Sequence, residues 1–462
     1  MRKRSVVALT AAVSILLASC GNGGPASTTA GSDKKTEPVT KIEIGGQPAE
    51  TGPAEPVTLN VVTTYADTDS NAGNFQTAVA EWEKLTGHGV NDGSAVSNEA
   101  FKARVQADFE NGTEPDVLFY FNGSGSNNFV KSGKVVPLEE IRAEYPEYAS
   151  NMNDSLMAPS PVDGKIYAVP VNGYWEALYV NKTIVESCGF SVPGPDTAWD
   201  EFLEMCEGIR EKGYTPIAVS LGEVPHYWFE FTIYNHLNPA KHSVLPSSAE
   251  DEYGLAWQAG LEDIKGLYEA GYLPEDTLTA TNDEISDLFL QGQAAFLLDG
   301  SWKVGSIVKS FRSSDQAEAD ETKLQNFTIT YVPGAGERKS TDIISGLSSG
   351  YYITRKAWED PEKRAAAVSF VEYMTSAAVV TRFAGTGATA LKNGAMIDED
   401  KLSSLERSGM AMLKGMTGTA AVTQDNLTDG AREWLFAQIP EIVTGQAEIP
   451  EVVEQALQKN AG

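Results

Sequence analysis

The stretch Pro115-Asp116-Val117-Leu118-Phe119-Tyr120-Phe121 predicts a buried strand, because an unbroken apolar run lies between Asp116 and a Gly-rich turn at 122–125. Upstream, the β-branched run at 57–64 predicts a second strand. Residues 75–85 and 101–109, between these strands, repeat their apolar side chains at helical spacing. The order strand, helix, helix, strand predicts an α/β fold built in layers.

Polar side chains follow both predicted strands. Tyr65 and Asp67 come after the first strand, and Asn122 and Ser124 come after the second. Ligands of α/β sheets bind beyond the carboxyl ends of the strands, so we expect these four residues near a binding site. Capping of their own loops is an equally good interpretation.

Two loops in this region resemble ion or phosphate sites only in part. The acidic run 67–71 starts like a calcium loop, but Ala72 and Ala78 stand where glycine and glutamate are needed. The segment 123–126 lacks the lysine and hydroxyl residue of a phosphate-binding loop. We therefore expect no metal and no cofactor, and a plain turn at 123–126.

The start of the chain has the pattern of a secretory signal. Arg2, Lys3 and Arg4 precede an uncharged apolar run at 5–17, and Leu17-Ala18-Ser19-Cys20 has the small residues and cysteine of a lipidation site. A transmembrane anchor is the alternative, but the run is shorter than the roughly 20 residues that span a bilayer. We predict a signal peptide at 1–19, a lipid on Cys20 and a disordered tether over 20–56, which is rich in Gly, Ser, Thr and Pro.

The length, net charge and cysteines of the chain limit its number of domains, its partners and its disulfides. Residues 57–462 exceed one ordinary hydrophobic core, which indicates two domains. The formal net charge of −29 argues against nucleic acid and anionic lipid as partners. Cys188 and Cys206 remain beside the lipidated Cys20, and either a disulfide or two buried thiols fits their spacing.

From residue 114 onward the chain resembles the sugar-binding lipoproteins of ABC importers, the maltose-binding-protein class of extracellular solute-binding proteins. Each matching motif is short, but they occur in the family's order over about 350 residues, with one alanine inserted at Ala198. The matching segments lie at 115–117, 132–138, 163–170, 178–182, 197–202, 289–296, 300–302 and 361–370.

The resemblance implies a two-lobed, type II periplasmic-binding-protein-like fold with a hinge and a ligand cleft between the lobes. By analogy, lobe one comprises 57–172 and 333–382, and lobe two comprises 173–332 and 383–462. The chain would then cross between the lobes near 170–172, 331–333 and 383–387.

The resemblance and the local sequence together suggest ligand contacts. A sugar site combines aromatic platforms with polar groups at its rim. Trp302 resembles the family tryptophan that stacks on sugar, although core packing is the alternative. Glu176 lies just after the first predicted crossing, in a segment that resembles the maltose-binding pattern at that point. The remaining candidates are aromatic, acidic or small residues near the same points, namely Tyr174, Trp175, Trp228, His226, Asp299, Gly346 and, less strongly, Trp434.

These expectations describe a membrane-anchored receptor on the extracellular face of the cell membrane. It would capture a carbohydrate, an oligosaccharide first of all, and deliver it to the permease subunits of an ABC importer. A secreted carbohydrate-active enzyme is an alternative, but no nucleophile elbow, zinc motif or isolated carboxylate pair indicates catalytic residues. A receptor for a non-sugar solute, such as a glycerol phosphate, is a second alternative.

The lipid anchor can be tested directly. Cys20→Ala removes the thiol that would carry the lipid, so we expect uncleaved or mislocalised precursor in place of a lipid-labelled protein at the membrane. Metabolic labelling with a palmitate analogue measures the change. A variant that still reaches the membrane with the same label would contradict the lipidation site.

Overall fold

The computed structural model describes residues 55–67, 69–312, 319–383, 389–395 and 397–461. The predicted signal peptide, Cys20 and nearly all of the predicted tether lie outside these residues, as does most of the third predicted crossing. No helix in the described part of the chain is both long and apolar enough to cross a bilayer.

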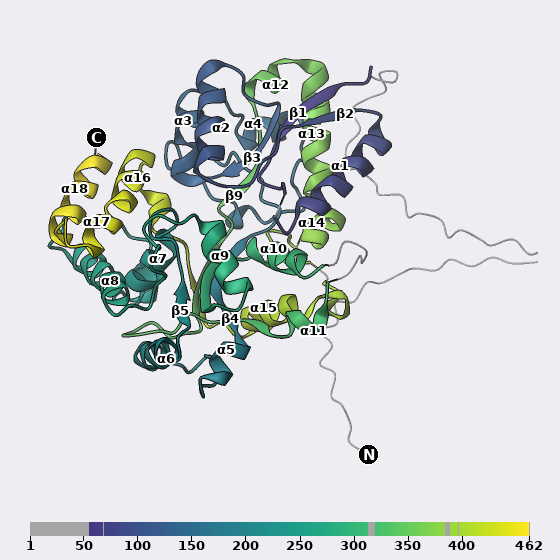
Figure 1. Cartoon of the computed structure of the whole chain (residues 1–462). Helices are drawn as coiled ribbons and strands as arrows, with labels where there is room; N and C mark the ends of the chain where they lie inside the picture. Colours follow the sequence, from purple (N-terminus) through teal and green to yellow (C-terminus); the bar gives the residue numbers. More distant parts are fainter. Residues whose placement is uncertain (1–54, 68, 313–318, 384–388, 396, 462) are drawn as a thin grey trace, which may run out of the picture. The chain divides into compact units, whose positions relative to one another are not determined.

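A four-stranded sheet organises one part of the fold, with β1 (Thr58–Val62) and β3 (Val117–Phe121) at its centre (Figure 1). The strand order is β2 (Gly89–Asp92), β1, β3 and β9 (Ser349–Ile353). Strand β1 is parallel to both neighbours, whereas β9 is antiparallel to β3. The strands predicted at 57–64 and 115–121 are thus confirmed as β1 and β3.

The two predicted helices are also confirmed, as α1 (Ala72–Thr86) and α2 (Glu99–Asn111). In α2, the Asn98 side chain accepts a hydrogen bond from the Phe101 N–H, which satisfies one of the free donors at the helix start. The helix ends at Gly112, whose φ of 74° suits glycine. Other helices of this part are α3 (Asn127–Lys131), α4 (Leu138–Glu144), α12 (Arg355–Glu359), α13 (Pro361–Met374) and α14 (Ala377–Phe383).

A larger sheet has β4 (Tyr174–Asn181) at its centre. The order is β10 (Gly418–Ala420), β8 (Asp342–Gly346), β4, β6 (Ala294–Gly300) and β5 (Thr215–Ala218), and β7 (Phe327–Thr330) also pairs with β4. Strand β4 runs antiparallel to β6, β7 and β8, and seven of its eight residues are buried.

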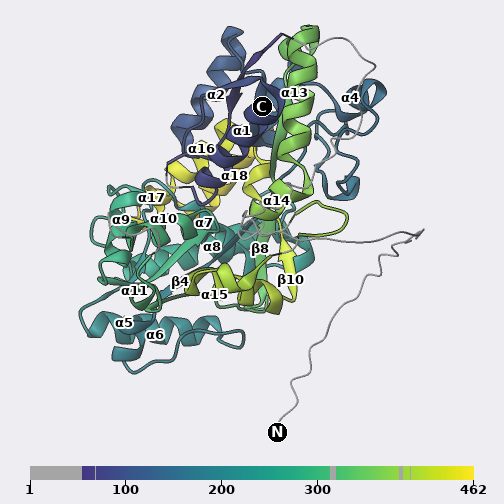
Figure 2. The same ribbon diagram turned by 90° about the vertical axis from the view of Figure 1, so that its right-hand side faces the viewer.

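Alternation along β4 divides the larger core into two clusters. Leu178 and Val180 pack on the side of α6 (Trp199–Glu211), α7 (His226–Tyr234) and α8 (Glu252–Glu269). Ala177 and Tyr179 pack on the side of α9 (Asn282–Leu290), α10 (Lys303–Ser310) and α15 (Ser404–Gly415). The remaining helices of this part are α5 (Lys182–Ser187), α11 (Glu321–Leu324), α16 (Asp429–Ala437), α17 (Ile439–Val443) and α18 (Ile449–Ala461), and α16 packs against α18 (Figure 2).

The chain returns to the smaller sheet later than the sequence suggested. We assigned 333–382 to lobe one, with a crossing near 331–333, but β8 within this range pairs with β4 and β10 of the larger sheet. Ile343 and Ile344 are buried in opposite clusters of that sheet. The change of sheet therefore falls at Leu347 and Ser348, between β8 and β9.

The two remaining cysteines are thiols and do not form the disulfide that the sequence left open. Cys188 and Cys206 are free, and Cys206 is fully buried in the larger core, where burial raises the pKa of its thiol well above the usual value.

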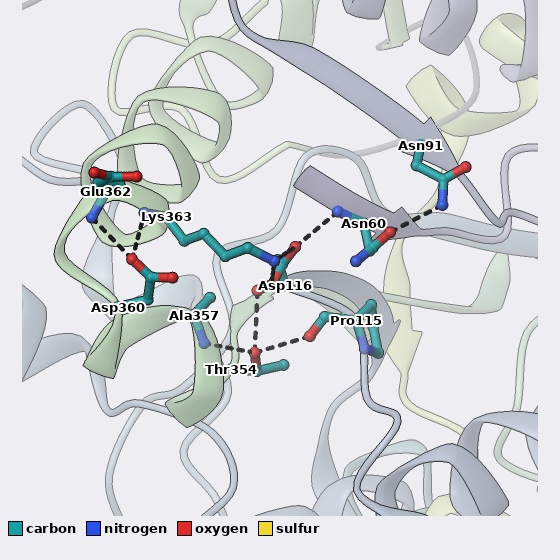
Figure 3. A network of polar contacts seen from close by, with 9 residues as sticks. All are labelled: Asn60, Asn91, Pro115, Asp116, Thr354, Ala357, Asp360, Glu362 and Lys363. Carbon is teal, nitrogen blue, oxygen red and sulfur yellow. Dashed lines mark hydrogen bonds and ion pairs between the residues drawn. The ribbon is translucent and has the colours of Figure 1, made fainter. Parts of the chain in front are cut away.

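A buried carboxylate ties the smaller sheet to α13 (Figure 3). Asp116, which is 1% exposed, accepts hydrogen bonds from the Asn60 N–H at 2.8 Å and from the Lys363 ammonium at 2.9 Å. The Thr354 hydroxyl donates to the Pro115 carbonyl at 2.8 Å, and the Thr354 N–H donates to the Asp116 carbonyl. These bonds connect β1, the start of β3, the end of β9 and α13.

Asp116→Asn should destabilise the protein by about 2–4 kcal/mol, because it removes the charge that compensates a partly buried lysine. Urea unfolding measures the loss. Asp287→Asn, on the exposed face of α9, is the matched control and should stay within about 0.5 kcal/mol of the wild type. Equal effects for the two variants would contradict a structural role for the Asp116 network.

Candidate functional site

The candidate site lies where β4 begins and β6 ends. Glu176 on β4 is directly opposite Gly300 on β6, so the two residues face the same side of the sheet. A Cβ atom on Gly300 would collide with the indole of Trp302, which therefore lies over Gly300. The carboxyl of Glu176 and the ring of Trp302 thus share one face.

A second glycine makes room for a second ring. Tyr174 is opposite Gly346, and a Cβ atom on Gly346 would lie 3.2 Å from Cε1 of Tyr174. We expected Gly346 to let its backbone approach a ligand. The structure places the tyrosine ring in that space instead.

Three half-buried aromatic rings form a cluster on this face. Trp302 lies between Tyr174, at a centroid distance of 6.1 Å, and Tyr227, at 5.9 Å, with interplanar angles of 41° and 43°. Tyr227 was not predicted, although its neighbours His226 and Trp228 were. Three aromatic rings in six residues were the available signal, and the helical phase of α7 decided which ring joins Trp302.

Four carboxyl groups lie close enough to act on one another in this part of the structure. Glu176 and Asp299, both predicted, are 2% and 1% exposed, and Glu230 of α7 is fully buried. Asp425 lies in the turn η6 (Gln424–Asn426). Burial raises the pKa of Glu176 well above the usual value, and the charges of the other three carboxyls raise it further.

Each of the other acids has compensating groups. Burial raises the pKa of Asp299, while the Lys303 ammonium, 3.7 Å away, lowers it. Burial, followed by the charge of Glu230, raises the pKa of Asp425 to about 6, against the opposing charges of Arg432 and Lys102.

Glu230 was missed by sequence reasoning and has a positioning role. Its carboxylate accepts hydrogen bonds from the backbone N–H groups of Thr423 and Gln424, both at 2.9 Å, and lies 2.8 Å from Nε2 of His242. These bonds fix the chain that leads into Asp425. A glutamate in the apolar helix segment His226–Tyr234 was the available signal.

His226 lies at the start of α7 beside Tyr227 and Phe436, with centroid distances of 4.3 and 5.6 Å. Burial, followed by the positive charges of Lys102 and Arg432, lowers the pKa of His226 to about 3. The imidazole is therefore neutral at physiological pH. Lys102 belongs to α2, so groups from both sheet regions act on this end of α7.

Two predicted tryptophans are placed differently from our expectation. Trp228 is 2% exposed and stacks on Phe202 of α6 at 6.2 Å, because α7 is apolar on nearly all sides. Trp175 is also 2% exposed and packs near Tyr179, since strand alternation turns it away from Tyr174 and Glu176. Neither indole joins the aromatic cluster. Trp434, on α16, lies under the Lys459 ammonium.

Tyr65 and Asn122, which follow strands of the smaller sheet, form hydrogen bonds to segments that connect the two sheets. The Tyr65 hydroxyl donates to Oδ1 of Asn172 at 2.9 Å, in the first predicted crossing. The Asn122 side chain donates to the Leu347 carbonyl at 2.9 Å, and its backbone N–H donates to the Ser348 carbonyl at 2.7 Å. The amide that we expected to face a ligand thus binds the segment between β8 and β9.

The remaining predicted residues of this region are at loops. Asp67 is exposed with a φ of 48°, and Ser124 lies in the turn η1 (Gly123–Ser126). Asp69, which we did not select as a ligand contact, has a pKa raised to about 7 by burial. The adjacent Ser70 lies so close to Gly305 of α10 that a Cβ atom there would collide with it. Among the residues that the structure describes, no group of three or more acidic, histidine or cysteine side chains is arranged to hold a metal.

Comparisons with protein families, individual proteins and solved structures all find binding proteins. The model of the family described as bacterial extracellular solute-binding protein matches residues 65–381. A binding protein of Brucella abortus is 22% identical over 247 residues, which cover 50% of this chain and 58% of that protein. The sn-glycerol-3-phosphate-binding periplasmic protein of the same species is 24% identical over 278 residues, which cover 55% and 64%.

A solved structure extends the match to nearly the whole chain. A chitin oligosaccharide binding protein aligns with a TM-score of 0.73 and 21% identity, covering 88% of this chain and 100% of that one. At this identity, the likeness shows a shared fold.

Gly300→Ala tests the geometry of the site. The added methyl group should displace the Trp302 indole, shift its fluorescence and cost about 1–3 kcal/mol of stability. Gly266→Ala in α8 is the control, because no atom lies within 4 Å of its added Cβ atom and the helix should gain roughly 0.5–1 kcal/mol. An unchanged fluorescence spectrum in Gly300→Ala would contradict the placement of the indole.

Proposed function

Because the chain belongs to the bacterial extracellular solute-binding protein family, we propose that it is a receptor that captures a carbohydrate, in the first place an oligosaccharide, and delivers it to an ABC importer. The family's two-lobed α/β fold is the framework of this proposal, with one sheet at the centre of each lobe. We further propose that a lipid on Cys20 anchors the receptor to the extracellular face of the membrane.

The observation that carries the sugar proposal is the face at the start of β4 that three aromatic rings share with the carboxyl of Glu176. Sugars present apolar faces and hydroxyl edges, so their sites combine aromatic platforms with polar groups. Trp302, Tyr174 and Tyr227 supply the rings, and Glu176 supplies a buried polar group on the same face. Asp299 pairs with Ala177 on the other side of the sheet, close enough for its charge to act on Glu176.

A glycerol phosphate is the alternative ligand, supported by the name of one relative. Phosphate recognition uses arginine or lysine forks and backbone N–H groups. Here the neighbouring cations already face carboxyls, Lys303 facing Asp299, and Arg432 and Lys102 facing Asp425. The excess of buried acids therefore favours an uncharged or positively charged ligand over a phosphate.

We propose binding without catalysis. A glycosidase needs two carboxyls free to act on the sugar, one as acid and the other as base or nucleophile. Glu230 is instead engaged by two backbone N–H groups and His242, and Asp299 by the Gly300 N–H and Lys303. A receptor returns its sugar unchanged, so incubation with oligosaccharides followed by chromatography separates it from an enzyme, which would release shorter products.

A thermal-shift screen across mono- and oligosaccharides, with glycerol 3-phosphate included, tests the ligand class. A ligand at a hundred times its dissociation constant should stabilise the protein by about 2.7 kcal/mol. Stabilisation by glycerol 3-phosphate and by no sugar would contradict the carbohydrate proposal.

Trp302→Ala should weaken carbohydrate binding by about 2–4 kcal/mol, because the indole would stack on a sugar face as a binding hot spot. Calorimetric titration measures the affinity, and thermal melting measures the stability of the same variant. Tyr214→Ala, which removes an exposed ring just before β5 and outside the aromatic cluster, is the control and should bind normally. Normal affinity with a large melting-temperature drop in Trp302→Ala would make Trp302 a core residue.

A further inference from the structure

Glu176 differs from the other acids of the site because one of its carboxyl oxygens is buried without a hydrogen-bond partner among the described residues. That oxygen is Oε2, and the side chain is 2% exposed. Its position opposite Gly300 places the carboxyl on the face covered by the Trp302 ring. An orphaned oxygen beside an aromatic platform is a place where a ligand group can bind.

The three neighbouring acids each have groups of the protein that offset part of the cost of their burial. Asp299 accepts a hydrogen bond from the Gly300 N–H at 2.7 Å and faces Lys303. Glu230 is bonded by two backbone N–H groups and lies beside His242. Asp425 lies within electrostatic reach of Arg432 and Lys102. Within the described part of the chain, the cation that would match Glu176 is therefore missing.

A buried carboxylate without a counter-ion is costly, so Glu176 must either hold a proton or meet a cation. The charged groups that face it are Glu230 of α7, Asp299 of β6 and Asp425 of η6, and all three disfavour its ionised form. Burial and these three charges therefore favour the protonated form of Glu176 when no ligand is bound.

We propose that Glu176 selects a carbohydrate that carries a protonated amino group on the sugar ring that stacks against Trp302. This inference rests on the proposed carbohydrate function and adds the charge of the ligand to it. An ammonium beside Glu176 supplies the missing counter-ion, and the face of the neighbouring indole attracts the same charge. A neutral sugar offers neither gain.

Binding of an amino sugar should release a proton from Glu176, and this release can be measured. The ammonium enters with its charge, the Glu176 carboxyl releases one proton to solvent, and the bound state holds an ion pair. Below the pKa of Glu176, each unit of rising pH should therefore strengthen binding of the amino sugar by up to tenfold. A neutral sugar exchanges no proton with Glu176 and lacks this dependence.

The probes are the β-1,4-linked disaccharide of glucosamine and the same disaccharide with both nitrogens acetylated, which differ in charge. Calorimetric titrations at pH 5.5 and 6.5 compare the wild type with Glu176→Gln, which keeps the shape and removes the charge. Glu186→Gln, on the exposed face of α5, is the matched control. Glu176→Asp, which retains a carboxyl, serves as the second variant if Glu176→Gln melts early.

We expect the wild type and Glu186→Gln to bind the glucosamine disaccharide at least tenfold more tightly than the acetylated one at pH 6.5. Affinity for the amino form should rise several-fold from pH 5.5 to 6.5. Both the preference and the excess pH dependence should be lost in Glu176→Gln and kept, at least in part, in Glu176→Asp. Asp425 also titrates in this pH range and its charge acts on Glu176, so the pH dependence is compared between the two disaccharides within each variant.

Equal or tighter binding of the acetylated disaccharide, or a preference that survives in Glu176→Gln, would overturn the inference. Binding of the acetylated disaccharide, or of a neutral sugar from the thermal-shift screen, would then leave the carbohydrate function intact. If neither probe and no sugar from the screen binds, the carbohydrate proposal itself fails, and this inference fails with it.

Discussion

Backbone pairing along β4 fixes the position of the candidate site within the larger sheet. The strand is hydrogen-bonded to β6, β7 and β8, so its register determines which side chains of the neighbouring strands share a face. Glu176 meets Gly300 across one pairing, and Tyr174 meets Gly346 across another. A slip of one residue would exchange the two faces and bury the carboxyl of Glu176 where Trp175 now packs.

The two glycines have the same physical role at both pairings. Each lacks a side chain at a point that an aromatic ring approaches closely, Trp302 at Gly300 and Tyr174 at Gly346. The rings can then approach each other and Tyr227 closely enough to form one cluster.

Electrostatic compensation separates the structural acids from the acid that we assign to ligand selection. Glu230 and Asp299 are buried, but N–H groups and cations offset the cost of their charge. Glu176 has equal burial and no such partner among the described residues, so its ionisation depends on what enters the site. The polar groups of Tyr65 and Asn122, by contrast, form hydrogen bonds to the segments that connect the two sheets.

The sequence by itself determined the α/β class, the strands β1 and β3 and the helices α1 and α2, because apolar periodicity is a local property. The grouping of Tyr174, Glu176, Asp299 and Trp302 was expected only from the resemblance to the solute-binding family. Only the tertiary structure decided which face each residue occupies. Trp175 and Trp228 turn into the core, and β8 joins the larger sheet. Tyr227 and Glu230 of α7 and Asp425 of η6 join the site from two further segments. These outcomes depend on strand register and on the packing of α7, which is apolar on nearly all sides, and neither is encoded in any single stretch of sequence.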